Sequence, residues 1–111
     1  MPLTKSDKIW MDGELVDWDD AKIHILTHTL HYGSGVFEGI RAYATSQGAA
    51  VFRLTEHIER LFNSAKVFLI DIPYTQVQLV DAADRITKAC SEAAGLEGAT
   101  SELGDKVAAS L

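Results

Sequence analysis

Two stripes of apolar residues at helical spacing constrain the fold of this chain most, because each stripe must be buried against another element. The first lies within residues 55–69 and consists of Ile58, Leu61, Phe62, Ala65, Phe68 and Leu69. The second lies within residues 75–95 and consists of Leu79, Ala83, Ile86, Cys90 and Ala93. The pattern predicts two helices. Thr55 is a favourable N-cap for the first, and the proline in residues 71–74 ends it.

The second helix has clear start and stop signals. Thr75 and Gln78 have the spacing of a capping box, in which each side chain accepts a hydrogen bond from the other residue's backbone N–H. Tyr74 and Leu79 match the hydrophobic staple that accompanies such a box. Gly95 offers a C-terminal stop.

Two hairpins are predicted before the helices. In residues 8–18, two apolar runs flank Asp12-Gly13, a pair that favours a type I′ turn. In residues 36–54, strands over 36–45 and 50–54 flank a turn at 46–48. Residues 19–30 show no clean period, and we expect irregular chain with a short helical turn near residues 28–31. The expected fold class is therefore α+β, a small antiparallel sheet of hairpins with two helices packed on one face.

Composition limits the partners of the chain. At 111 residues we expect one domain over residues 1–95 and a flexible tail over 96–111, which is rich in Gly, Ala and Ser. Ten basic against sixteen acidic residues give a net charge of −6, which argues against nucleic acid and anionic membranes as partners. No transmembrane or signal segment is visible, so a cytoplasmic location is expected. The single cysteine, Cys90, is expected to be a small buried hydrophobe.

The segment 31–43, HYGSGVFEGIRAY, has the residue types of a binding site. Three glycines within seven residues lie among aromatic and charged side chains, an arrangement that suits a small ligand both apolar and anionic. The alternative is a glycine-marked bend that enters a strand. In strand geometry one face carries Phe37, Gly39, Arg41 and Tyr43, and the other carries Val36, Glu38, Ile40 and Ala42.

Two further candidates leave alternatives open. Arg60 is either a solvated arginine that pairs with Glu56, or a cation aimed at an anion beside the preceding strand. His24, His28 and His31 would align on one helical face and could suggest a zinc site. They lack the acidic or cysteine ligand of known motifs, so ordinary hydrogen-bonded histidines are favoured and no metal is expected.

Three segments resemble a known family: IWMDGELV, LHYGSGVFEGIRAY and VFRLTEHIERLFNSAK. Over residues 9–95 the chain is similar to the small N-terminal domain of branched-chain amino acid aminotransferases, fold-type IV enzymes that use pyridoxal 5′-phosphate. The resemblance implies that Arg60 contacts the cofactor phosphate. It implies that Phe37 lines the substrate pocket and that Tyr32 reaches an active site at a dimer interface, with Gly39 and Arg41 on the substrate side. Tyr32, Phe37 and Arg60 would then form half of a pocket.

Other family features have no counterpart here. The family's Schiff-base lysine lies in a larger C-terminal domain, and none of the six lysines of this chain matches its motif. The family also has a YIRP-like motif after the second helix, where this chain reads TSEL. We therefore expect no catalytic residue here and no transaminase activity from the chain alone. Amino transfer between Leu, Ile or Val and 2-oxoglutarate, and cofactor binding, would belong to a complete, homo-oligomeric enzyme. The alternative is a non-catalytic module that binds a partner or self-associates through an exposed apolar patch.

Overall fold

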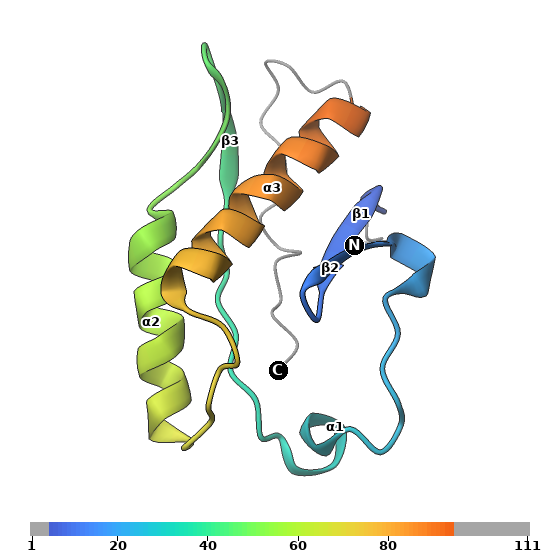
Figure 1. Cartoon of the computed structure of the whole chain (residues 1–111), viewed down its shortest axis with the longest axis vertical. Coiled ribbons are helices and arrows are strands. Elements are labelled where there is room, and N and C mark those ends of the chain that lie inside the picture. Colours follow the sequence, from blue (N-terminus) through green and yellow to red (C-terminus); the bar gives the residue numbers. More distant parts are fainter. Residues whose placement is uncertain (1–4, 95–111) are drawn as a thin grey trace.

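The computed structural model describes residues 5–94, with side chains through Ser91. Its elements are β1 (Lys8–Met11), β2 (Glu14–Asp17), η1 (Trp18–Asp20), α1 (His28–Tyr32), β3 (Ala42–Thr45), β4 (Gly48–Val51), α2 (Leu54–Val67) and α3 (Gln76–Ala94). Helix α3 crosses the middle of the molecule, between α2 and the β1–β2 hairpin (Figure 1). It also contacts β4. The α+β class is confirmed, with the strands in two separate two-stranded sheets.

The first hairpin is as predicted. Strands β1 and β2 are antiparallel, with Met11 opposite Glu14. Asp12 and Gly13 have φ of 52° and 92°, the positive values that the two central residues of a type I′ turn require. A Cβ added to Gly13 would lie 3.3 Å from the Tyr74 hydroxyl, so glycine is favoured here by space as well as by conformation.

The second hairpin is shorter than predicted. Strand β3 begins at Ala42, opposite Val51 at the end of β4, and residues 36–41 belong to no strand. The predicted first strand over 36–45 is wrong because β4 has only four residues and the chain then turns into α2. Within residues 5–94, segment 36–41 therefore has no strand to pair with. The predicted alternation of faces is confirmed, since Phe37, Gly39 and Arg41 are exposed and the residues between them are covered.

Helix α2 differs from the prediction at both ends. Its N-cap is Arg53, with φ of 49° and no capping side chain, so the N-cap role expected of Thr55 is wrong. The earlier start places Leu54 in the core. The helix ends at Val67, and Phe68 and Leu69 are exposed, Leu69 by 91%. These two residues therefore do not continue the buried stripe of Ile58, Leu61 and Ala65.

Helix α3 begins with the predicted capping box. The Thr75 N–H donates to Gln78 Oε1 at 2.8 Å, and the Gln78 N–H donates to Thr75 Oγ1 at 3.1 Å. The predicted stripe is buried at Leu79, Ala83, Ile86 and Cys90. The Ala93 side chain, Gly95 and the predicted tail over 96–111 lie outside the described residues.

The core joins α2 and α3 to the end of segment 36–41. Its buried cluster consists of Ile40, Leu54, Ile58, Leu61, Leu79 and Ala83. Trp10 of β1 packs against it, with its ring edge-on to Tyr74 at a centroid distance of 5.1 Å. No helix within residues 5–94 is long and apolar enough to cross a membrane. Because Ile40 is anchored in this cluster, the segment that carries Glu38 is held against α2.

Candidate functional site

Glu38 is a nearly buried carboxylate on segment 36–41, with a side chain that is 6% exposed. It lies on the covered face of the segment, two residues before Ile40. This placement follows from the alternation of side chains in extended chain. A carboxylate in such a position requires hydrogen-bond donors, and α2 supplies them.

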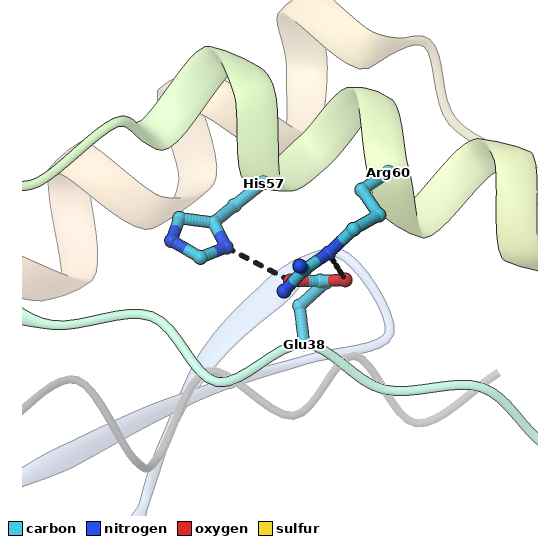
Figure 2. A network of polar contacts seen from close by, with 3 residues as sticks. All are labelled: Glu38, His57 and Arg60. Atoms are coloured by element: carbon cyan, nitrogen blue, oxygen red, sulfur yellow. Dashed lines mark hydrogen bonds and ion pairs between the residues drawn. The ribbon is translucent and has the colours of Figure 1, made fainter.

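Two side chains of α2 bind this carboxylate. Arg60 donates from Nε to Glu38 Oε1 at 2.6 Å and from Nη2 to Oε2 at 2.7 Å. His57 Nδ1 lies 2.8 Å from Oε2. His57 and Arg60 are three residues apart and so lie on one face of the helix, pointing down onto Glu38 (Figure 2). The result is a bidentate arginine–carboxylate pair with a histidine as third member, which we call the Glu38 cluster.

The charges of the cluster reinforce one another. The hydrogen bonds from Arg60 lower the pKa of Glu38 below its ordinary value, and His57 adds to the effect, although burial acts in the opposite direction. The carboxylate in turn raises the pKa of the Arg60 guanidinium. Glu38 is therefore ionised at neutral pH and can only accept, so His57 Nδ1 donates to it.

Arg60 retains donors for a further anion. Its side chain is 66% exposed, and Glu38 engages two of its five N–H groups within the described part of the chain. Within the described residues Arg60 pairs with Glu38 and not with Glu56, so its expected partner one turn earlier on α2 is wrong, while its side chain is largely exposed as the first alternative expected. Glu56 instead pairs with Arg53, whose Nη1 lies 3.8 Å from Glu56 Oε1. The phosphate contact of Arg60 stays a prediction.

The predicted substrate-side residues lie apart from the Glu38 cluster. Phe37, 81% exposed, shares with Gly39 and Arg41 the face of the segment opposite Glu38. Among the residues that the structure describes, nothing lies within 4 Å of a Cβ added to Gly39, so none of them fills the space at this glycine. Tyr32 is on α1 and is 77% exposed, with its ring near those of His28 and His31. In the described part of the chain, no hydrogen bond or ring contact joins Tyr32 to Phe37 or Arg60.

The histidines near α1 make local contacts. His24 Nδ1 accepts from the Leu26 N–H at 3.0 Å, and His31 Nε2 donates to the Ile25 carbonyl at 2.6 Å. These bonds agree with the interpretation of ordinary hydrogen-bonded histidines. Across residues 5–94, no three possible metal ligands of the His, Cys, Asp or Glu type gather into one group.

Sequence reasoning missed Glu38 and His57 as members of the site. It placed Glu38 on the face of the predicted strand opposite Phe37 but gave it no partner. The available signal was the spacing of His57 and Arg60 on one helical face, combined with an acidic residue on the face opposite Phe37. A contact that spans 22 residues cannot be read from either pattern alone.

The sequence of this chain matches a known family of proteins. The family model for Amino-transferase class IV matches residues 35–104. The branched-chain-amino-acid aminotransferase of Pseudomonas aeruginosa is 60% identical over 74 residues, which are 67% of this chain and 24% of that protein. The protein of the same name from Escherichia coli K12 is 46% identical over 82 residues, 74% of this chain and 26% of that protein. The chain thus spans about a quarter of the length of these relatives.

Solved structures agree with the sequence relatives. The branched-chain aminotransferase from Thermoproteus uzoniensis with norvaline matches with a TM-score of 0.72 at 48% identity, covering 77% of this chain and 29% of that one. The T.th. branched-chain amino acid aminotransferase complexed with N-(5′-phosphopyridoxyl)-L-glutamate matches with a TM-score of 0.74 at 44% identity, covering 84% of this chain and 30% of that one. The fold described above is therefore that of one part of these larger proteins.

Proposed function

The chain belongs to the class IV aminotransferase family, and we propose that it forms the small domain of a branched-chain aminotransferase that uses pyridoxal 5′-phosphate. The reaction would move an amino group between Leu, Ile or Val and 2-oxoglutarate. The relatives' names support the substrate class, and the phosphopyridoxyl-glutamate complex of the T.th. enzyme supports the cofactor. The observation that carries the proposal is the Arg60 side chain, which is two-thirds exposed and whose guanidinium is held at one edge by Glu38.

Arg60 would hold the phosphate of the cofactor. The planar guanidinium presents N–H groups in a fork that matches phosphate oxygens, and the edge away from Glu38 is accessible. When bound, the cofactor supplies an electron sink for the carbanion that forms at the substrate. The chain's own contribution would be to bind and orient the phosphate end.

The face opposite Glu38 would contact the substrate. Phe37 offers an exposed apolar surface and Arg41 a cation, with open space at Gly39 between them. An apolar wall suits aliphatic side chains, and it discriminates weakly among them because one methylene is worth only about 1–3 kcal/mol. Tyr32 would approach the substrate from α1 at a dimer interface.

A chimera tests this function. The matching 74 residues of the Pseudomonas aeruginosa relative are replaced by those of this chain, and glutamate formed from leucine and 2-oxoglutarate is measured. We expect activity, and we expect Arg60→Gln to weaken affinity for pyridoxal 5′-phosphate. Arg85→Gln is the matched control, since Arg85 is an exposed arginine on α3 whose only ion pair in the described part is with Asp81. A folded chimera without activity, or equal effects of the two substitutions, would contradict the proposal.

A second candidate function is self-association without catalysis. The observation that favours it is a group of exposed apolar side chains within residues 23–37, namely Ile23, Ile25, Leu26, Leu30, Tyr32 and Phe37. Sedimentation of the 111-residue chain at several concentrations tests it. A discrete oligomer from a chain whose chimera is inactive would favour this function, and a monomer at all concentrations would exclude it.

A further inference from the structure

We propose that Glu38 is a positioning residue for an anion site, because it holds one edge of the Arg60 guanidinium and thereby directs the other edge toward a phosphate monoester. The inference rests on the proposed function, in which Arg60 binds the cofactor phosphate. It adds a role for a residue that does not itself touch the phosphate.

The structure supplies a reason why Glu38 can hold Arg60 firmly. The Glu38 carboxylate is almost buried and receives a third hydrogen bond from His57. Its residue lies in the chain between the exposed Phe37 and the buried Ile40. The position of the carboxylate is therefore fixed by the anchored backbone at Ile40 and by its hydrogen bond to α2. An exposed arginine without such a partner samples many rotamers and must be ordered when an anion binds. The bidentate pair removes most of that cost beforehand.

The geometry also shows which donors remain. Glu38 engages Nε–H and one Nη2–H, which form one fork of the guanidinium. The second Nη2–H and one Nη1–H form the terminal fork, and the other Nη1–H lies on the edge next to Cδ. These three donors are those that a phosphate could approach. They point away from Glu38, so both anions can contact the guanidinium at once.

Charge alone predicts the opposite effect of Glu38. The carboxylate neutralises Arg60, so a purely electrostatic account expects removal of its charge to strengthen anion binding. The positioning account expects the same removal to weaken binding, because the guanidinium loses its fixed orientation. The sign of the change in affinity therefore separates the two accounts.

The experiment uses the chimera described above, which carries the whole cofactor site, and follows the Nε–Hε NMR signal of its Arg60. The probe is pyridoxamine 5′-phosphate, which has no aldehyde to react with lysines, and pyridoxamine is the control without phosphate. We expect only the phosphorylated probe to shift the Arg60 signal, and Glu38→Gln to weaken its binding roughly threefold to tenfold. Glu56→Gln, an exposed carboxylate one turn away, should leave the affinity unchanged.

Each outcome is decisive. Equal or tighter binding to Glu38→Gln, with a normal response in the unsubstituted chimera, would overturn the positioning role and leave the proposed function intact. An Arg60 signal that does not respond to the probe in the unsubstituted chimera would overturn both.

A second measurement needs no variant, in case Glu38→Gln does not fold. Rotation of the Arg60 guanidinium in the wild type without ligand should be slower than that of the exposed Arg85, because two of its nitrogens are bound to Glu38. Equal rotation rates for these two arginines would overturn the proposal.

Discussion

Glu38→Gln should destabilise the folded chain by about 1.5–3 kcal/mol at pH 7, the usual worth of a hydrogen bond to a charged group. Glutamine keeps one acceptor oxygen, but its NH₂ group replaces the other oxygen. That NH₂ group would then face the N–H groups of His57 or Arg60, which are donors as well. At least one charge-assisted bond to a nearly buried group is therefore lost. Because Arg60 is largely exposed, solvent screening places the expected loss near the lower figure.

This loss should depend on pH with a defined sign. The pKa of Glu38 is lowered in the folded state from its ordinary value of 4.5, mainly by the hydrogen bonds from Arg60. A group with a lowered folded pKa stabilises the fold above its unfolded pKa, and that stabilisation disappears as the pH falls through the folded pKa. The difference in the free energy of unfolding between wild type and Glu38→Gln should thus reach its full value at pH 7 and be smaller at about pH 3.

Urea unfolding at the two pH values measures this difference. With a slope of about 1–3 kcal/mol/M, the expected loss at pH 7 moves the midpoint by about 1 M. Glu56→Gln is the control and should stay within about 0.5 kcal/mol of wild type, because both Glu56 and its partner Arg53 are exposed. An equal loss at pH 7 and pH 3 would refute the reasoning, since the cause would then be packing and not charge.

Three further predictions concern the fold and the substrate face. Thr75→Ala should cost about 0.5–2 kcal/mol in urea unfolding because the Gln78 N–H loses its acceptor, whereas Thr55→Ala should cost less, as Thr55 is no cap; equal losses would contradict the capping box. Leu61→Ala should cost about 2–5 kcal/mol, seen as a Tm lowered by at least about 8 °C, because Leu61 is 4% exposed; a smaller shift would count against the described core. Phe37→Ala should leave the free energy of unfolding within about 0.5 kcal/mol but raise the KM of the chimera for leucine; an unchanged KM would remove Phe37 from the substrate face.

Local signals predicted the local structure of this chain. The Asp12-Gly13 turn and the box of Thr75 and Gln78 each depend on residues close together in the sequence, and both are confirmed. The end of the first helix was predicted too late, because Phe68 and Leu69 continue the apolar spacing although the helix ends at Val67. The spacing of apolar residues does not reveal that the chain changes direction after Val67, where Leu69 adopts a φ of 55°.

Contacts between distant segments were not predictable in the same way. The strand expected from residue 36 needs a partner, and the length of that partner is set by where α2 begins. The link between Glu38 and Arg60 likewise depends on how segment 36–41 lies on α2, which Ile40 determines by joining the core. The sequence predicted a site role for Arg60 and the face of Glu38, and only the packing shows that the two side chains meet.

The central claim is that Arg60 is a phosphate-binding residue, and phosphorus NMR of pyridoxamine 5′-phosphate tests it most directly. The ³¹P signal is followed as the chimera, its Arg60→Gln variant or its Arg85→Gln variant is added. The account predicts that the chimera and its Arg85→Gln variant move the signal by the same amount and that Arg60→Gln moves it much less. A signal that Arg60→Gln moves as far as the unsubstituted chimera does would contradict the account.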